Sequence, residues 1–259
     1  MKILTLNTWQ ERGPWHDRWE RIFCGLAKHQ ADIVGFQEVF NMDWAEEIHK
    51  RSGYPYLAIS GKHSGLIFLS KFKPVEQECL VMKTKSPTED YLRYIFYIRV
   101  DTGKEKIAVF NTHLSWKADE NEIRLKQTLE LEAFVQKKAG NLPMVLLGDL
   151  NAGPDASSVT YLRETLGWCD TFEAKNPGDP GLTWNYRNPY AEAEREKMAE
   201  RRIDYIFIRE QMGPFKKIQS SNIVFDKPSD NGVYPSDHFG VMTEFGDQRN
   251  GCGDHGNHK

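Results

Sequence analysis

The sequence lacks paired cysteines, long apolar runs and a strong net charge. Its four cysteines are scattered, with no Cys-x-x-Cys pair and no Cys/His ligand spacing, which argues against a zinc site and a disulfide framework. No apolar stretch approaches the roughly 20 residues of a membrane-spanning helix, and no signal peptide is visible at the N-terminus. The net charge of −3 neither requires nor excludes a polyanionic partner. These absences predict a soluble, cytoplasmic protein with free thiols.

What the sequence does contain is an ordinary globular composition. It has 259 residues, of which 39% are hydrophobic and 27% are charged. A chain of this length buries most of its apolar surface without metal or disulfide cross-links. With no internal repeat and no linker, a single catalytic domain is predicted over residues 1–246. Residues 247–259, which contain glycines but no apolar periodicity, are predicted to be a disordered tail.

Short strand-like runs alternate with amphipathic helical stretches, a pattern typical of α/β proteins. Strands are predicted over 2–7, 33–37, 66–69, 75–81, 91–100, 107–112, 144–147, 202–208, 218–225 and 239–245. Helices are predicted over 19–29, 44–50, 121–138 and 157–166, with Ser157 and Ser158 as candidate N-caps of the last one. Residues 191–201 are highly charged and are predicted to form an exposed helix or insertion.

Polar residues occur where predicted strands end or where an apolar run is broken. Each of them alone is explained as a strand end, a turn residue or a satisfied core side chain. Eight at such boundaries indicate one site at the rim of a rigid sheet. The eight are Asn7, Glu38, His113, Asp149, Asn151, Asp204, Asp237 and His238.

These residue types suit the hydrolysis of an ester with the help of a hard cation. Carboxylate and carboxamide oxygens without cysteine are typical ligands of Mg²⁺, and we expect Glu38 to hold it with Asn7 and Asp237. A phosphate oxygen sharing that ion would have its developing negative charge neutralised. Hydrolysis also needs an activated water, which a carboxylate–histidine pair commonly provides.

Six motifs resemble those of the endonuclease/exonuclease/phosphatase superfamily. They occur in the order typical of that family and extend over nearly the whole chain, from residue 6 to residue 241. GDLN followed much later by SDH is the specific combination, whereas QEV or IDYIF alone is weak. The motifs are LNTW (6–9), GFQEV (35–39), NTHLS (111–115), LLGDLNAGP (146–154), RRIDYIF (201–207) and PSDHFGV (235–241).

The resemblance implies both a fold and a set of roles. The fold is a four-layer α/β/β/α sandwich, with two mixed sheets face to face and helices outside. Glu38 resembles the principal Mg²⁺ ligand, assisted by Asn7 and Asp237, with Mn²⁺ as an alternative ion. The implied catalytic residues are Asp149 and Asn151 beside the phosphate, His238 oriented by Asp204, and His113 as a second histidine. Which of them acts as the general base stays open.

The motifs favour a phosphodiesterase but leave its substrate open. The LNTW opening, SGLIFLSK (64–71) and NTHLSW are similar to sphingomyelinase-like members, so a phospholipid head-group ester is ranked first. The alternatives are a DNA or RNA nuclease, a sugar- or inositol-phosphate phosphatase, and a catalytically silent binding module. No stable protein partner and no transmembrane segment are implied.

Substrate contacts are predicted in the TWNYR segment. Family members often place recognition residues in this region. Trp184 is suited to stacking on a base or sugar, Arg187 to pairing with a second phosphate, and Asn185 lies between them. A buried tryptophan that only anchors the loop is the equally weighted alternative.

Overall fold

The computed structural model describes residues 1–209 and 212–246, and its centre is two six-stranded β-sheets. The first sheet has the order β11-β12-β1-β2-β4-β3 and the second has the order β5-β6-β7-β8-β10-β9. Each sheet contains one parallel pair, β1 with β2 and β7 with β8, and its other pairs are antiparallel. Both sheets are therefore mixed, as predicted. The predicted tail lies outside the described residues.

The strands agree closely with the sequence prediction. The first sheet contains β1 (Lys2–Asn7), β2 (Ile33–Gln37), β3 (Tyr56–Ile59), β4 (Ile67–Ser70), β11 (Ile218–Val224) and β12 (Gly240–Phe245). The second contains β5 (Lys73–Val81), β6 (Tyr94–Asp101), β7 (Lys106–His113), β8 (Met144–Asp149), β9 (Trp168–Asp170) and β10 (Asp204–Arg209).

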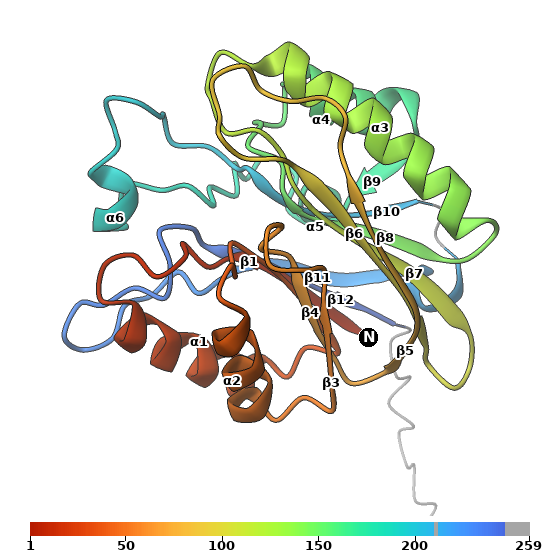
Figure 1. The fold of residues 1–259 in the computed structure, drawn as a ribbon, viewed down its shortest axis with the longest axis horizontal. Helices are drawn as coiled ribbons and strands as arrows, with labels where there is room; N and C mark the ends of the chain where they lie inside the picture. The colour runs from red at the N-terminus through yellow and green to blue at the C-terminus, as the bar shows by residue number, and fades with distance from the viewer. Residues whose placement is uncertain (210–211, 247–259) are drawn as a thin grey trace, which may run out of the picture.

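Helices cover the outer face of each sheet, which completes the four-layer sandwich (Figure 1). The first sheet is covered by α1 (Trp15–His29) and α2 (Met42–Ser52). The second is covered by α3 (Asn121–Ala139) and by α4 (Ser157–Thr160), which continues as a π-helical turn, Tyr161–Thr165. The remaining pieces are α5 (Thr171–Lys175), α6 (Pro189–Glu192) and a 3₁₀ turn, Gly213–Phe215.

Apolar residues fill three layers, because both faces of each sheet are covered. Along β1, Ile3 packs between the sheets, whereas Leu4 and Leu6 pack against the helical side. Along β8, Leu147 packs between the sheets and Leu146 packs under α3. This alternation follows from the two-residue period of a strand and explains why these strands read as continuous apolar runs.

Three details differ from the sequence prediction. Ser157 and Ser158 do not cap α4: its N-cap residue is Ala156, and the Ser158 hydroxyl is buried without a hydrogen bond. Strands β3 and β9 and helix α5 were not predicted, because they are only three to five residues long and carry little periodicity. The charged segment near residue 191 contains only the short helix α6, followed by turns.

The expectations about membrane-spanning helices and about cysteines can be compared with the described part of the chain. None of its helices is both long and apolar enough to cross a membrane. Cys24, Cys79 and Cys169 are free thiols, as predicted, while Cys252 lies outside the described residues.

Candidate active site

The register of the second sheet brings three predicted site residues together. Asp149 at the end of β8 lies directly opposite His113 on β7 and directly opposite Asp204 on β10. Directly opposed side chains on neighbouring strands lie on the same face, with Cβ atoms about 5 Å apart. Accordingly, His113 Nε2 lies 3.4 Å from Asp149 Oδ2.

Gly148 permits this approach of β7 to β8. It has a φ of +138°, which side-chain-bearing residues rarely adopt, and a Cβ there would collide with the carbonyl oxygen of Thr112. Thr112 is its partner in the parallel ladder. The glycine of the GDLN motif is therefore needed to place Asp149 beside His113.

The first sheet contributes Asn7 and Glu38. Asn7 ends β1 and Glu38 immediately follows β2, its parallel neighbour. Asn7 Nδ2 donates to Asp149 Oδ2 at 2.9 Å and to Glu38 Oε1 at 3.2 Å, so this amide joins the two sheets. Its Oδ1 accepts from the amide of Trp9 at 3.0 Å. This oxygen has a second lone pair, so the predicted ligation of a cation by Asn7 is compatible with the bond from Trp9.

His238 lies between three carboxylates. Its Nδ1 is hydrogen-bonded to Asp204 Oδ2 at 2.9 Å, while Nε2 lies 3.9 Å from Asp149 Oδ2 and 4.0 Å from Asp237 Oδ1. Burial lowers the pKa of His238, but Asp204, Asp237 and Asp149 together outweigh this and hold it well above 6.5. The three carboxylates therefore favour the protonated form of the ring, which Asp204 orients.

Three aspartates of the site, Asp149, Asp204 and Asp237, are buried close to one another. Burial raises the pKa of Asp149 to about 7, and the neighbouring Asp204 acts in the same direction. Burial also raises the pKa of Asp237 to about 6, with Glu38 contributing to the rise. Like charges held this close favour a bound cation, and the oxygen-only donor set fits a hard divalent ion.

Two sets of side chains are candidates for holding that cation. Ligand atoms of Asp149, Asp204 and His238 all lie within 4.8 Å of one another. However, Asp204 is fully buried and does not line the cleft, and its hydrogen bond occupies His238 Nδ1. The sequence-predicted set is Asn7, Glu38 and Asp237, all of which line the cleft.

Backbone strain concentrates at this site. Among the described non-glycine residues only six have positive φ, and four of them line the cleft. Glu38 has a φ of +64° and Asn151 a φ of +50°; the other two are Trp9 and Gln10. Such conformations cost about 1–3 kcal/mol each and cluster where side chains must be held in a defined direction. The amide of Asn151 also donates to Asp149 Oδ1 at 2.8 Å.

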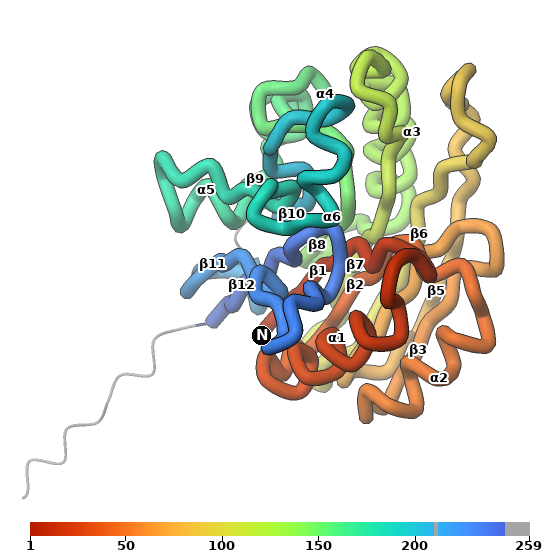
Figure 2. The backbone as a smooth tube through the Cα atoms, turned by 90° about the vertical axis from the view of Figure 1, so that its left-hand side faces the viewer, coloured from red at the N-terminus to blue at the C-terminus, as the bar shows by residue number. Residues whose placement is uncertain are grey.

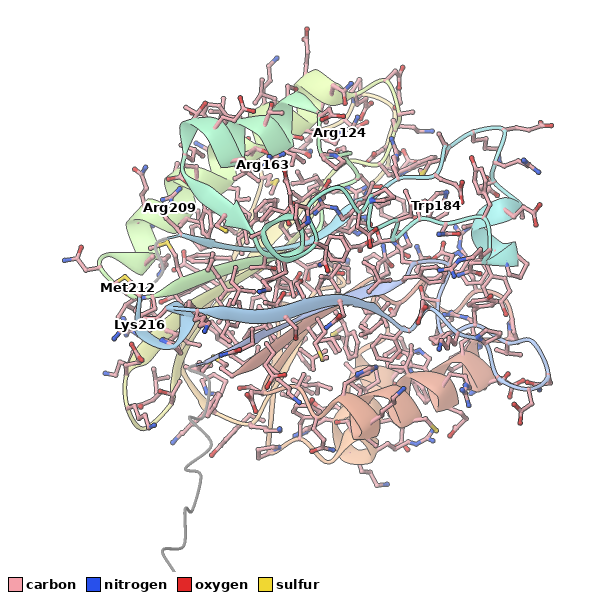
Figure 3. The ribbon with its side chains drawn as sticks, turned by 180° about the vertical axis from the view of Figure 1, so that it is seen from behind. Arg124, Arg163, Trp184, Arg209, Met212 and Lys216 are labelled. Atoms are coloured by element: carbon pink, nitrogen blue, oxygen red, sulfur yellow. The ribbon has the colours of Figure 1, made fainter. Side chains whose placement is uncertain are left out.

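A cleft of about 500 Å³ opens above these residues. Trp184 is one of its walls and meets the ring of His238 edge to face, with the centroids 5.1 Å apart. Trp184 lies at the end of the molecule that carries α6 (Figure 3). The structure does not bring Asn185 and Arg187 to the cleft: Asn185 accepts from the amide of Arg187, whose guanidinium lies over the ring of Phe239.

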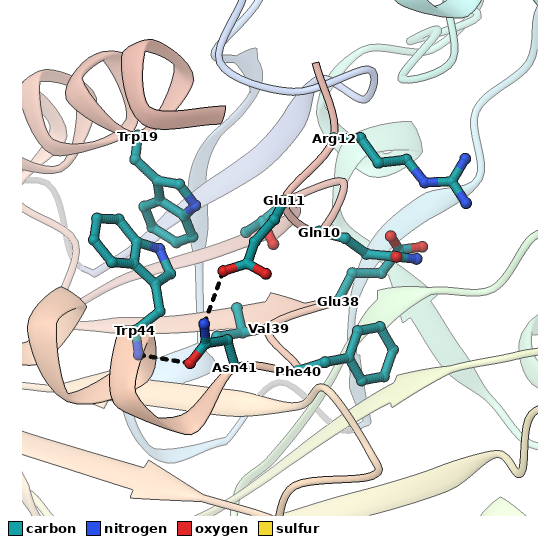
Figure 4. Close-up of a pocket in the computed structure, with 10 residues that line it drawn as sticks. Gln10, Glu11, Arg12, Trp19, Glu38, Val39, Phe40, Asn41 and Trp44 are labelled. Atoms are coloured by element: carbon teal, nitrogen blue, oxygen red, sulfur yellow. Dashed lines mark hydrogen bonds between the residues drawn. The ribbon is translucent and has the colours of Figure 1, made fainter. Parts of the chain in front are cut away.

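A smaller pocket of about 180 Å³ lies beside Glu38 (Figure 4). Across its floor, Asn41 Nδ2 donates to Glu11 Oε1 at 2.8 Å, and Asn41 Oδ1 accepts from the amide of Trp44 at 3.1 Å. These bonds tie the loop after β1 to the start of α2. Gln10, Arg12, Glu38 and Phe40 line both this pocket and the large cleft.

Sequence reasoning missed Arg18, which fixes the loop after β1. It is fully buried in α1, and burial lowers its pKa to about 10. Its guanidinium donates to five main-chain carbonyls, those of Thr8, Trp9, Gln10, Arg12 and Pro235. The same side chain thus holds the segments that follow Asn7 and precede Asp237. Because all its partners are main-chain atoms, no pattern of residue types could have revealed it.

Fold, motifs and site geometry define the class of this protein. The profile of the Endonuclease/Exonuclease/phosphatase family matches residues 25–238, and the chain belongs to this family of metal-dependent phosphoester hydrolases. It is 24% identical over 237 residues to tyrosyl-DNA phosphodiesterase 2 of Xenopus tropicalis. The matched region is 85% of this chain and 59% of the relative. The chain thus spans about six tenths of the length of that relative.

Two solved structures share the fold. Truncated TDP2 of Caenorhabditis elegans superposes with a TM-score of 0.77 at 19% identity, over 94% of this chain and 96% of that one. A mannosyl-6-phosphatase of Bacteroides thetaiotaomicron superposes with a TM-score of 0.75 at 19% identity, over 95% of this chain and 100% of that one. The names of these two proteins indicate different substrates, so the fold alone does not choose one.

The raised pKa of Asp149 predicts an effect on stability. An unfolded aspartate ionises near pH 3.8, whereas folded Asp149 keeps its proton to about pH 7. Its contribution to stability is therefore full below about pH 4, falls as the pH rises, and is lost above about pH 7. We expect Asp149→Asn, which cannot ionise, to raise the Tm of the EDTA-treated protein at pH 8 and to change it little at pH 4.

Circular dichroism melts from pH 4 to pH 8 provide the measurement. Each kcal/mol corresponds to about 2–4 °C for a domain of this size. Asp101→Asn, at an exposed aspartate, is the matched control and should leave the Tm unchanged at both pH values. If Asp149→Asn lowers the Tm at pH 8, the burial of an ionised carboxylate is not the dominant effect.

Proposed function

We propose that this protein is a magnesium-dependent phosphodiesterase that acts on single-stranded nucleic acid or on a group joined to its end by a phosphodiester. The proposal rests chiefly on the position of Asp149 at the floor of an aromatic-lined cleft. Its Oδ2 lies 2.9 Å from Asn7 Nδ2, 3.4 Å from His113 Nε2 and 3.9 Å from His238 Nε2. A phosphoryl group entering there meets a carboxylate and two imidazoles at once.

In the proposed site, Glu38 and Asp237 would hold Mg²⁺, or Mn²⁺ as the alternative ion, with help from Asn7. A cation there would supply positive charge to the phosphoryl oxygens as negative charge develops on them. The electrostatics of the chain support this assignment, because Glu38 contributes to the raised pKa of Asp237. That repulsion is relieved when a cation binds.

Asp149 is proposed as the general base. A group with a pKa near 7 combines a useful deprotonated fraction with proton affinity, and burial places the pKa of Asp149 at about 7. His238 is then the cationic partner, donating from Nε2 to a phosphoryl or leaving-group oxygen. Asp204 fixes the ring through Nδ1 and is a positioning residue. Asn151 and His113 contact the remaining phosphoryl oxygens.

Nucleic acid is proposed ahead of the phospholipid ester that the motifs ranked first. A relative at 24% identity, tyrosyl-DNA phosphodiesterase 2 of Xenopus tropicalis, is named for an activity on DNA. Aromatic and basic side chains also line the cleft together, a combination suited to bases and phosphates of a single strand. They include Trp9, Trp184 and Tyr190 with Arg12, Arg93 and Lys197. Trp184 lines the cleft but is only 5% exposed and packs with Ala191 and Ile203, which favours the alternative of a tryptophan that anchors its loop.

A parallel hydrolysis assay tests this proposal, with Mg²⁺ and then with EDTA. The substrates are bis-p-nitrophenyl phosphate, p-nitrophenyl phosphate, p-nitrophenylphosphorylcholine, and single-stranded oligodeoxynucleotides carrying a tyrosyl phosphodiester at the 5′ or the 3′ end. We expect EDTA-sensitive cleavage of bis-p-nitrophenyl phosphate and of one of the two oligonucleotides. Hydrolysis confined to p-nitrophenyl phosphate indicates a phosphatase, and hydrolysis confined to the phosphorylcholine ester indicates the phospholipid branch.

A further inference from the structure

Three exposed apolar side chains stand together at the rim of the cleft. Tyr91 is 51% exposed, and Leu92 and Trp116 are each 39% exposed, yet all three line the cleft. We refer to Tyr91, Leu92 and Trp116 as the aromatic shelf. An exposed apolar cluster beside a polar site is costly in water and typically marks a binding surface. Tyr91 stacks on Phe40 with the ring centroids 6.3 Å apart, yet half of its surface stays exposed.

The loops that carry the shelf are fixed from beneath. The Glu89 side chain is fully buried, with Oε1 accepting from the amide of Trp116 at 2.6 Å and Oε2 accepting from Arg93 at 2.7 and 3.0 Å. Glu89 therefore locks the loop before β6 to the loop after β7. The rings are presented on a rigid base, which lowers the entropy cost of binding a ligand.

Further bonds hold the first of these loops to α3. Glu120, the residue before α3, accepts from the hydroxyls of Ser86 at 2.6 Å and Thr88 at 2.8 Å. Glu130 within α3 accepts from the amides of Lys83 and Thr84, both at 2.7 Å. Since carboxylate–amide bonds of this kind are strong, the shelf is part of the rigid body that holds His113.

The loop that carries Tyr91 and Leu92 and the segment that carries Trp184 are separate parts of the cleft lining. Figure 2 shows the connection between β5 and β6 on one side of α3 and the segment that contains α6 on the other. A phosphodiester has two ester arms. One arm can therefore run towards Trp184 while the other runs over the shelf.

Cationic groups accompany the shelf. Lys117 Nζ lies 4.1 Å from the ring centroid of Trp116, a cation–π contact. Arg93 lines the cleft and uses Nε and Nη2 for Glu89, so that among the described residues Nη1 has no hydrogen-bond partner. A ring system next to a phosphate complements this arrangement, whereas an uncharged acyl chain leaves the cations unused.

We propose that the aromatic shelf binds a nucleobase of single-stranded nucleic acid by stacking, with the adjoining phosphate at Arg93 and Lys117. This inference rests on the proposed function and deepens it, because it assigns a base-binding site to a part of the cleft lining separate from Trp184. The bases are recognised by their π-faces, so the shelf selects single strands over duplexes without strong preference among the four bases.

The test measures binding rather than turnover, in the Asp149→Asn background with Mg²⁺. Fluorescence anisotropy gives the Kd of a labelled thymidine octamer and of an octamer with the same backbone but no bases. We expect Trp116→Ala and Tyr91→Ala each to weaken binding of the thymidine octamer by about 5–100-fold, the range that one stacked base contributes. Trp116→Phe should restore most of the affinity, and the base-free octamer should not distinguish the variants.

Leu129→Ala is the matched control, since Leu129 is an exposed apolar residue of α3 with 46% exposure that does not line the cleft. In the otherwise native enzyme, Leu129→Ala should leave hydrolysis of bis-p-nitrophenyl phosphate unchanged, and a native-like circular dichroism spectrum and Tm of Trp116→Ala verify that its fold is intact. Equal octamer affinity of the parent and both shelf variants overturns the inference while the proposed function stands.

Two other outcomes also decide against the shelf as a base site. If the parent protein binds no octamer and the native enzyme cleaves only bis-p-nitrophenyl phosphate, the nucleic-acid part of the proposed function fails, and the shelf assignment fails with it. If Trp116→Ala instead reduces sedimentation with phosphatidylcholine–phosphatidylserine vesicles while octamer binding is unchanged, the shelf is a membrane contact and the inference is wrong.

Discussion

Replacing His238 with alanine is expected to lower kcat for phosphodiester hydrolysis by about 10²–10⁴-fold, the usual effect of removing a general acid–base group. The imidazole is buried, its Nδ1 is bound to Asp204, and its Nε2 lies 3.9 Å from Asp149 Oδ2. Removing it takes away the cation that faces the phosphoryl group. It also leaves three carboxylates without their shared counter-charge.

Steady-state kinetics of bis-p-nitrophenyl phosphate hydrolysis at saturating Mg²⁺ measure this effect. His29→Gln is the control, because His29 lies at the end of α1 and does not line the cleft. Asp204→Asn should cost less than His238→Ala, since the ring remains and only its orientation and charge are weakened. A near-native rate for His238→Ala contradicts the proposed role.

Glu38→Gln is expected to abolish most activity at low Mg²⁺ and to recover part of it at high Mg²⁺. Glu38 lines the cleft, it is bonded to Asn7, and its carboxylate acts on Asp237. The glutamine amide lacks the negative charge of glutamate but keeps one oxygen donor. The ion is therefore expected to bind at the same position with lower affinity. We expect the Mg²⁺ concentration for half-maximal activity to rise by at least about tenfold, which corresponds to about 1.4 kcal/mol.

A Mg²⁺ titration of the rate, paired with calorimetric titration of the EDTA-stripped protein, distinguishes weaker ion binding from misfolding. Glu20→Gln, at an exposed glutamate of α1, should reproduce the native curve. If Glu38→Gln and the native enzyme require the same Mg²⁺ concentration, Glu38 is not a ligand.

Apolar runs predicted most of the strands because these strands are buried on both faces, whereas the sandwich arrangement was implied by the family resemblance. Runs such as KILTLN and MVLLGD are apolar enough to be identified without context, and β1 and β8 lie where they were predicted. The short strands β3 and β9 carry only four and three residues, and they exist because a longer neighbour offers them an edge to pair with. Such pairing depends on tertiary structure and leaves little trace in local sequence.

The grouping of the predicted site residues could be inferred from the sequence for a related reason. The pairing register of the strands brings Asp149 beside His113 and Asp204. Polar residues at the ends of these strands were therefore expected to lie close together in space. Arg18 and the aromatic shelf could not be predicted in this way. The hydrogen bonds of Arg18 all go to main-chain carbonyls, and Tyr91 and Trp116 come from separate loops that Glu89 joins. The one hint of the shelf in the sequence is an aromatic residue, Trp116, three positions after His113 in the NTHLSW motif.

The central claim is that a water at Asp149 attacks phosphorus directly, and isotope labelling tests it. A single turnover of bis-p-nitrophenyl phosphate in H₂¹⁸O, with enzyme in excess and Mg²⁺ present, is followed by mass spectrometry of product and protein. The account predicts one ¹⁸O in the p-nitrophenyl phosphate product and none in the p-nitrophenol, with the product label lost together with activity in EDTA. A phosphorylated protein intermediate, or label found in p-nitrophenol, would contradict it.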